Sequence, residues 1–320
     1  MSPLSLLAAA TLPLAAFAKQ PHRPCAVDPF QNPKTDPCNP LTYIPSNTLT
    51  GIAFGLYVAV ALIQAFHMMR WGARWMAPMV IGAYTFSIGI GTRLGLHDMP
   101  DSKGIYIVFY LLVVLSPCAF IASDYILLGR MARSLNAGKH LLIPPTRITA
   151  FFITSDVTTF LIQAAGGSIS IAANDIKTNK LGSNVFLAGL VLQLVSFLGF
   201  TSVYLLWLYR VRRYEPETWR RDSSNPWHRD WRTLAGALVI SCIGILIRSV
   251  YRTIELSQGF KGRIATVEAF FYAFDTFPLF LAILVYVFFW PGWFIPDQAG
   301  TNAEKSVDVE KPSGAVDSKE

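Results

Sequence analysis

Charged side chains interrupt two apolar stretches in the C-terminal third of the sequence, residues 233–256 and 265–290. Each stretch is long enough to cross a bilayer as a helix, because a helical residue rises about 1.5 Å and the hydrocarbon core is about 30 Å thick. In both stretches the polar side chains recur at i, i+4 and i+7, which places them on one helical face. They are Arg248, Arg252 and Glu255 in the first stretch and Glu268, Tyr272 and Asp275 in the second.

A charged group at the centre of a bilayer costs at least about 2.5–3.5 kcal/mol, so it generally faces the protein interior and pairs with an opposite charge. Two arginines and three carboxylates on consecutive helices could neutralise one another. We therefore predict one network that joins Arg252, Glu255, Glu268 and Asp275. This network could recognise a substrate or control its path, or it could simply hold two helices together, and the sequence leaves both interpretations open.

Other polar side chains also fall within apolar stretches. Gln163 follows Asp156 by seven residues, on the same helical face, and Gln193 lies in the middle of the next stretch. Asp156 and Asp275 come near the bilayer midplane, and Asp275 is expected to lie away from the two arginines. The positions predict a polar cavity in the middle and outer half of the bundle. The candidate substrate-binding residues are Asp156, Gln163, Gln193, Arg248, Arg252, Glu255, Glu268, Tyr272 and Asp275.

The elements that position these side chains are predicted from composition. Of 320 residues, 52% are hydrophobic and only 15% charged, and the mean hydropathy is +0.40. Apolar stretches of about 20 residues recur along the chain, which is typical of transmembrane helices. We predict an all-α, polytopic membrane protein whose seven-helix bundle covers residues 48–290. The predicted spans are 48–69, 75–97, 105–128, 148–170, 184–208, 233–256 and 265–290.

The two ends of the chain differ from this core. Residues 1–18 are apolar and end in Ala16-Phe17-Ala18, which favours a cleaved signal peptide over a retained helix. An extracytoplasmic segment over residues 19–47 follows, and it holds Cys25 and Cys38, which we predict to form a disulfide rather than to remain free thiols. Residues 291–320 are predicted to form a disordered cytoplasmic tail.

The connecting loops alternate in charge, which predicts the orientation in the membrane. Loops on one side carry thirteen basic residues and loops on the other side carry five. The positive-inside rule then places the N-terminus outside and the C-terminus in the cytoplasm. The thirteen are Arg70, Arg74, Arg130, Arg133, Lys139, Arg147, Arg210, Arg212, Arg213, Arg220, Arg221, Arg229 and Arg232, and the five are Lys103, Lys177, Lys180, Lys261 and Arg263.

Several classes of chemistry have no support in the sequence. There is no GxxxxGK[ST], HExxH or GxSxG motif, so neither ATP hydrolysis nor these two hydrolase types is indicated. Only five histidines occur, too few within the spans for a metal hydrolase, and no lysine lies in a predicted span to carry a retinal Schiff base. We predict no enzyme activity, no metal and no cofactor. The basic residues cluster in loops rather than among aromatics, so nucleic-acid binding is not expected.

Five of the predicted spans carry short motifs of small, amide, aromatic and charged residues. The motifs are Pro117 with Ala122-Ser123-x-Tyr125 and Leu128-Gly129-Arg130; Phe152-x-x-x-Asp156 with Gln163-Ala164-x-Gly166-Gly167; Gly189-x-x-x-Gln193; Arg248-Ser249-x-Tyr251-Arg252-x-x-Glu255 with Gln258-Gly259; and Glu268-x-x-x-Tyr272-x-x-Asp275. From about Cys38 to Pro291, the chain resembles the fungal lipid-translocating exporter family. This is the RTA-like group of seven-helix proteins linked to aminocholesterol resistance and sphingoid-base export.

Two departures from the family pattern concern charges. Phe86 stands where the second span usually carries a glutamate, which removes an expected partner for Arg93. Asp124 stands where the third span usually has an apolar residue. We interpret Asp124, which lies near the cytoplasmic end of the third span and close to Arg130, as a carboxylate that either extends to the membrane surface or pairs with a loop residue.

The resemblance implies a plasma-membrane protein that exports or translocates amphipathic lipids, such as sphingoid long-chain bases, or lipophilic toxic compounds, without its own ATPase. A cationic amine on such a lipid could pair with Asp156, Glu268 or Asp275. The alternative is a seven-helix sensor or receptor that signals through the basic loop 209–232 and the tail. Membrane lipids are the expected partners, and the sequence leaves the oligomeric state open.

Overall fold

The computed structural model describes residues 28, 30–31, 33–34, 36, 39–172, 176–223, 226, 229–259, 262 and 264–295. Within these residues seven helices are long and apolar enough to cross a membrane, which confirms the predicted all-α, seven-span fold. The predicted signal peptide, Cys25 and Cys38, and the tail from residue 296 onward lie outside the described residues. The spans are α2 (Asn47–Trp71), α3 (Ala77–Asp98), α4 (Lys103–Ser134), α5 (Pro145–Ala172), α6 (Ile176–Tyr214), α8 (Trp231–Ser257), and a composite last span of α9 (Glu268–Phe270), η5 (Phe271–Thr276) and α10 (Phe277–Phe288).

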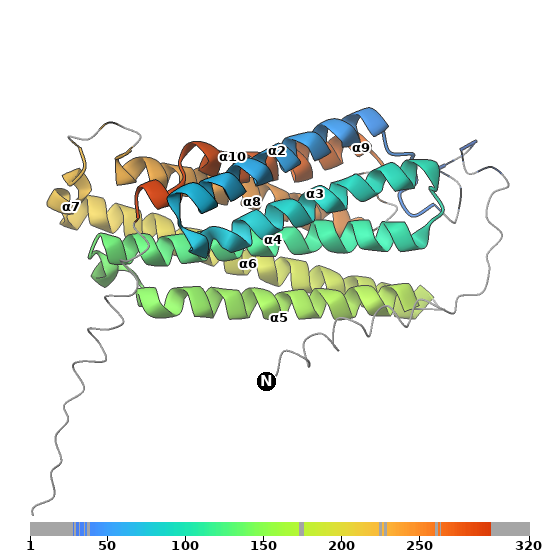
Figure 1. Cartoon of the computed structure of the whole chain (residues 1–320). Helices are drawn as coiled ribbons and strands as arrows, with labels where there is room; N and C mark the ends of the chain where they lie inside the picture. Colours follow the sequence, from blue (N-terminus) through green and yellow to red (C-terminus); the bar gives the residue numbers. More distant parts are fainter. Residues whose placement is uncertain are drawn as a thin grey trace, which may run out of the picture.

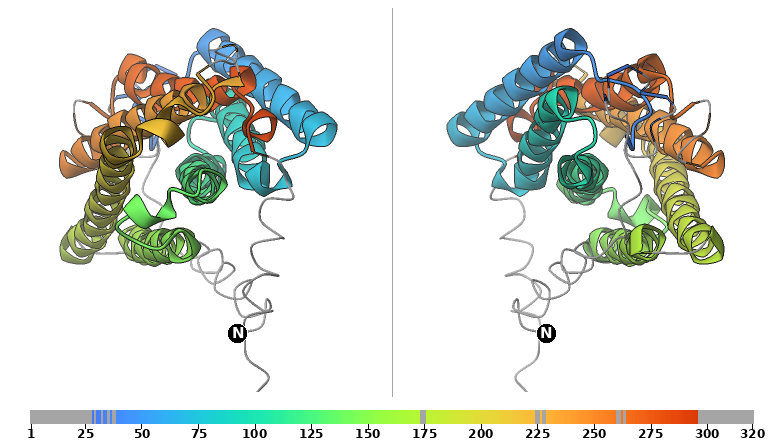
Figure 2. Two further views of the ribbon diagram at one scale, coloured as in Figure 1. Left: turned by 90° about the vertical axis from the view of Figure 1, so that its left-hand side faces the viewer. Right: turned by 90° about the vertical axis from the view of Figure 1, so that its right-hand side faces the viewer.

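The helices pack around one central member. Consecutive spans contact each other, and α10 returns to pack against both α8 and α2. Figure 2, which looks along the helices, shows α4 near the middle of the bundle, and α4 contacts α8 as well as α3 and α5. Figure 1 shows the start of α2 at one end of the bundle and the short α7 (Pro216–Arg220) at the other. We call these the α2-start end and the α7 end.

The spans are apolar on both their inner and outer faces, as expected for helices that contact lipid. On α2, for example, Ile52 and Leu56 are exposed while Tyr57 and Gln64 are buried. The buried polar groups of α2 reach the last span, because Tyr57 Oη donates to the Thr276 carbonyl at 2.7 Å and Gln64 Nε2 donates to the Ile283 carbonyl at 2.8 Å. Hydrogen bonds between polar side chains and backbone thus fix the contact between the first and last spans.

Helix α6 differs from its prediction in length. It has 39 residues, so it is about 58 Å long, well beyond the hydrocarbon core. The predicted fifth span 184–208 therefore covers only its middle, and residues 209–214, predicted as the start of a basic loop, continue the helix. Two hydrogen bonds hold the C-terminal part of α6 against its neighbours. Trp207 Nε1 donates to the Ala137 carbonyl, and Tyr204 Oη donates to the Ala235 carbonyl.

Glycines let α5 and α6 approach closely. A Cβ atom on Gly166 would lie 2.3 Å from the Phe186 nitrogen, and one on Gly182 would lie 2.3 Å from the Ser170 nitrogen. Gly51 and Gly55 of α2 also have GxxxG spacing, but nothing lies within 4 Å of their Cβ positions. Close backbone approach through small residues therefore occurs between α5 and α6, and it also occurs at Gly244 of α8, where a Cβ atom would lie 2.4 Å from the Pro278 carbonyl oxygen.

The last span contains a wide, π-helical turn, η5, directly before Pro278. Proline has no N–H and its ring collides with the carbonyl four residues earlier, so the preceding turn must loosen. A π turn holds about one residue more than an α turn, which offsets the two flanking segments by roughly 100°. Glu268 and Asp275 consequently do not share a face, although their i, i+7 spacing predicts that they do.

The ordered bundle extends past residue 290. Trp290 is buried and its Nε1 donates to the Gly72 carbonyl, and Pro291–Trp293 form a short 3-10 turn. Ile295 is also buried. These residues close the α7 end of the contact between α2 and the last span.

Candidate functional site

Asp275 lies at the centre of an ion cluster between α8 and the last span. It is fully buried, and each carboxylate oxygen contacts a different guanidinium group. Arg248 Nη1 donates to Oδ2 at 2.7 Å and Arg252 Nε donates to Oδ1 at 2.5 Å. Arg248 Nη2 also donates to the Val113 carbonyl of α4 at 2.7 Å. The expectation that Asp275 lies away from both arginines is wrong, because they reach it from one turn apart on α8.

Arg252 extends this cluster to Glu255. Its Nη1 donates to Glu255 Oε2 at 2.9 Å, so Arg252 bridges two carboxylates. Glu255 is the more accessible of the two, with 19% of its side chain exposed, whereas Asp275 has none. The predicted connection between Arg252, Glu255 and Asp275 is therefore confirmed.

Glu268 belongs to a second cluster and not to the first, which corrects the prediction of a single network. Its Oε1 accepts from Arg93 Nη2 at 2.8 Å, and both its oxygens accept from the backbone N–H of Ser46. Arg93 has no exposed surface and also donates to Tyr43 Oη at 3.2 Å. Burial raises the pKa of Tyr43, so the phenol stays protonated and neutral beside Arg93. The π turn is the cause of the separation, since it directs Glu268 toward α3 and Asp275 toward α8.

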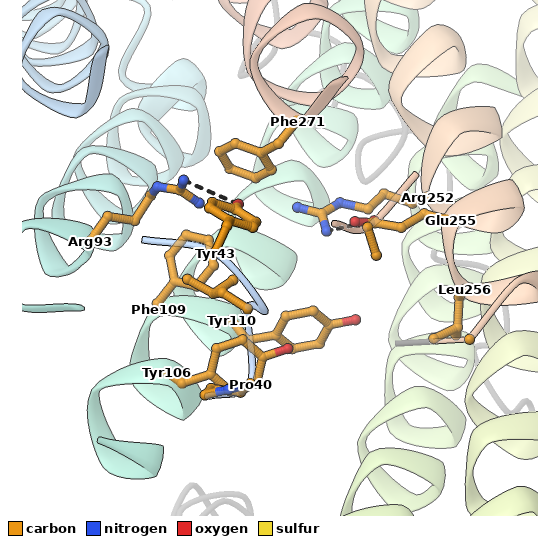
Figure 3. A pocket seen from close by; sticks show the side chains of 13 residues that line it. Pro40, Tyr43, Arg93, Tyr106, Phe109, Tyr110, Arg252, Glu255, Leu256 and Phe271 are labelled. Carbon is orange, nitrogen blue, oxygen red and sulfur yellow. Dashed lines mark hydrogen bonds and ion pairs between the residues drawn. The ribbon is translucent and has the colours of Figure 1, made fainter. Parts of the chain in front are cut away.

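Phe271 separates the two clusters. The guanidinium carbon of Arg93 lies 4.6 Å from the centre of its ring, and that of Arg252 lies 5.5 Å from it. Figure 3 shows the two arginines pointing toward each other from α3 and α8, with Phe271 above and Tyr43 between them. Cations over an aromatic face are attracted by the ring quadrupole, so one ring contributes to holding both charges.

A cavity of about 590 Å³, counting its open mouth, lies beside these arginines at the α2-start end (Figure 3). Residues 40–43 form one part of its wall, and the other parts come from α3, α4, α8 and η5. Arg93, Arg252 and Glu255 supply its charges, and Tyr106 and Tyr110 of α4 supply aromatic surface. We call it the head cavity.

A second cavity of about 480 Å³ lies among α4, α5, α6 and α8. Gln163 and Gln193 line it and bind each other, with Gln163 Nε2 donating to Gln193 Oε1 at 2.8 Å. The rest of the wall is mainly apolar, and Tyr110 and Arg252 line both cavities. The second cavity, which we call the side cavity, is thus adjacent to the head cavity.

The remaining predicted residues lie off the cavity walls. Asp156 accepts from Tyr125 Oη at 2.8 Å, beside aromatic rings of α5 and α6. Tyr272 Oη and Thr50 Oγ1 are 3.0 Å apart, which joins the last span to α2. Five predicted residues line a cavity, namely Gln163, Gln193, Arg248, Arg252 and Glu255.

Sequence reasoning did not select Tyr43, Arg93, Tyr110 or Phe271 as site residues. Arg93 is a charge within a span, and that signal alone could have selected it. The aromatic residues carry no comparable signal in a sequence with 13% aromatics.

Asp124 and Phe86 also differ from their interpretation. Asp124 is fully buried and pairs with hydroxyls: Ser241 Oγ donates to Oδ2 at 2.7 Å and Tyr286 Oη donates to Oδ1 at 2.8 Å. Asp124 therefore neither reaches the membrane surface nor pairs with a loop residue, because two neighbouring spans supply its hydroxyl donors. Phe86 lies under Arg248, with its ring centre 5.6 Å from the guanidinium carbon, and Arg93 does not lack a partner, because Glu268 provides one.

Among the residues that the structure describes, no group of three or more His, Cys, Asp and Glu side chains could hold a metal ion. The side chains that line the two cavities supply charge, hydrogen bonding and apolar contact. Such a site can hold an amphipathic molecule with a polar head and an apolar body.

Comparison with known proteins identifies the family of this chain. The family model described as "RTA1 like protein" matches residues 79–298, which include the ion clusters and most of both cavities. The chain is 29% identical to Protein RTA1 of Saccharomyces cerevisiae over 214 residues, 67% of this chain and 65% of that protein. It is 31% identical to Protoporphyrin uptake protein 1 of the same species over 213 residues, 65% of this chain and 66% of that protein.

A further yeast relative is more distant but matches over a longer range. The Sphingoid long-chain base transporter RSB1 of Saccharomyces cerevisiae strain YJM789 is 20% identical over 273 residues, 76% of this chain and 70% of that protein. The chain spans just under two thirds of the length of RTA1 and of the protoporphyrin uptake protein. No solved structure matches the chain.

Proposed function

We propose, from the premise that this chain belongs to the RTA1-like family, that it translocates amphipathic lipids across the fungal plasma membrane without its own ATPase. The names of two relatives support movement of amphipathic molecules, since one is a sphingoid long-chain base transporter and another a protoporphyrin uptake protein. Sphingoid long-chain bases and lipophilic toxic compounds are the proposed substrates. Both combine a polar group with a large apolar part.

The observation that carries this proposal is the pair of adjacent cavities. The head cavity holds the charged and phenolic groups, while the side cavity is mainly apolar apart from Gln163, Gln193 and the two arginines of α8. Arg252 and Tyr110 form part of both walls, so one molecule can place its head in one cavity and its chain in the other. An amphipathic lipid fits this division, because each of its parts meets surface of its own kind.

Within the head cavity, Glu255 is the carboxylate that we assign to a substrate amine. Asp275 is saturated by two arginines, and Glu268 by Arg93 and a backbone N–H. Glu255 Oε2 accepts from Arg252, and the side chain remains partly exposed on the cavity wall. A cation can therefore reach Glu255 without breaking an existing ion pair.

The test is a lipid-translocation assay in sealed vesicles that contain only the purified protein. A fluorescent sphingoid base should cross faster than in protein-free vesicles, and Glu255→Gln should slow it at equal protein content. Glu217→Gln serves as the matched control, because Glu217 is exposed on α7 at the other end of the bundle. Equal rates with and without protein would contradict the proposal, and lipid binding without movement would favour the sensor alternative.

A further inference from the structure

Three guanidinium nitrogens at the head cavity have no hydrogen-bond acceptor among the described residues. They are Nε and Nη1 of Arg93 and Nη2 of Arg252, and all three are buried. Both arginines line the cavity and point toward one another across it (Figure 3). Phe271 offers a π face to both, but it offers no acceptor atom. A buried charged donor without an acceptor is costly, so this wall is complementary to acceptor oxygens that the described residues do not supply.

The charge balance of the two ion clusters limits which ligand can supply these acceptor oxygens. The two clusters together hold three arginines, Arg93, Arg248 and Arg252, and three carboxylates, Glu255, Glu268 and Asp275. The clusters are therefore neutral as a set. A ligand with a net charge would leave one charge uncompensated in a low-dielectric site, whereas a ligand with one positive and one negative group would not.

We propose that the head cavity binds a zwitterionic head group in which a phosphate lies close to an ammonium. The phosphate oxygens accept from the free N–H groups of Arg93 and Arg252, and the ammonium pairs with Glu255. Arginine suits this role because its planar fork donates to two oxygens at once. This proposal rests on the proposed function for the site and predicts which amphipathic lipids bind most tightly: those that carry both groups, ahead of sphingoid bases, which carry the ammonium alone.

The experiment measures equilibrium binding by the purified protein in a nonionic, phosphate-free detergent. The three probes have hydrocarbon chains of equal length. They are a lyso-phosphoethanolamine lipid with both groups, its N-acetylated form with the phosphate alone, and an alkylamine with the amine alone. The two-group lipid should bind at least about tenfold more tightly than either single-group probe, as expected for one lost charge-assisted contact. Equal affinity for the alkylamine would overturn the phosphate site, and equal affinity for the N-acetylated lipid would overturn the ammonium site.

Inorganic phosphate distinguishes a lipid head group from a free anion. As a competitor it should displace the two-group lipid only weakly, because it lacks both the ammonium and the chain. Inorganic phosphate that competes as well as the unlabelled lipid would overturn the assignment to a lipid and indicate a free-anion site.

Two variants locate the contacts. Arg93→Lys keeps the charge opposite Glu268 but removes the planar fork, so it should weaken binding of the two-group lipid at least about tenfold and leave alkylamine binding unchanged. Arg213→Lys, at the exposed end of α6, is its control. Glu255→Gln, on the cavity rim, should abolish the preference over the N-acetylated lipid even if Arg93→Lys does not fold.

The outcomes separate this proposal from the proposed function. Unchanged head-group selectivity in both variants would overturn the zwitterion site while vesicle transport stayed intact. Selective binding by a protein that moves no lipid would leave the site standing and contradict the transport function.

Discussion

Asp275 compensates two arginines at once, and this makes it a structural residue of the bundle. Asp275→Asn keeps the shape but leaves Arg248 and Arg252 with one negative charge fewer in a buried site. Breaking a buried pair on one side costs about 3–5 kcal/mol, so we expect a marked loss of folded protein in the membrane. The abundance of the variant in the membrane and its melting temperature in detergent measure this loss.

Glu255→Gln is the matched control for this change, because Glu255 is partly exposed and pairs with Arg252 alone. It should fold at nearly normal abundance. Normal abundance and stability of Asp275→Asn would contradict the structural role and return Asp275 to the substrate-recognition hypothesis.

Glu215, just after α6, makes stability depend on pH. Its hydrogen bond from Lys139 Nζ at 2.5 Å, with further donors such as Thr218, lowers the pKa of this carboxyl below its ordinary value. A lowered pKa in the folded state stabilises the protein above the ordinary carboxylate pKa, and this gain is lost as pH falls through the lowered value. The melting temperature of the wild-type protein should therefore exceed that of Glu215→Gln at neutral pH, and the two melting temperatures should converge in acid.

The control for this titration is Glu217→Gln, two residues away on α7. Its melting temperature should follow that of wild type at every pH. A constant difference between wild type and Glu215→Gln down to strongly acidic pH would show that the carboxylate charge is not the cause.

At the scale of elements, the α5–α6 contact depends on the absence of side chains. Gly166→Ala and Gly182→Ala each place a Cβ 2.3 Å from a backbone nitrogen of the facing helix, so the helices must separate. Overpacking of this kind typically costs about 1–3 kcal/mol. We expect lower melting temperatures for both variants in detergent. Gly55→Ala is the control, because nothing lies within 4 Å of its Cβ position; a similar loss there would assign the effect to helix propensity or lipid contact instead.

Elements also show what sequence periodicity could predict and what it could not. Apolar length correctly located every span, because the bilayer thickness imposes it. Ion-pair partners were predicted only in part, since the i, i+7 argument assumes 3.6 residues per turn and η5 breaks that period between Glu268 and Asp275. The hydrogen bonds that Ser241 and Tyr286 donate to Asp124 depend on which helices are neighbours in the bundle. Hydropathy does not encode this order of helices, so these partners could not be predicted.

At the scale of the whole molecule, charge is divided between the two ends. The thirteen basic loop residues predict that the α7 end faces the cytoplasm and that the head cavity opens on the opposite side. A reporter fused after residue 320 should therefore be cytoplasmic. Protease protection in intact cells and lumenal glycosylation of an acceptor tag at the same position measure this. A glycosylated C-terminal tag would reverse the orientation and, with it, the side on which the head cavity opens.

The wide turn in the last span has a mechanical consequence. A π turn is a surplus residue stored within a helix, and displacing it along the helix turns each residue that it passes by roughly 100° and advances it by about 1.5 Å. In this chain the surplus lies between the carboxylate that faces α3 and the one that faces α8. Moving this surplus residue past Glu268 would turn the carboxylate about the helix axis while Pro278 and α10 stayed in place. Phe271, which lies between the two arginines, would turn with it.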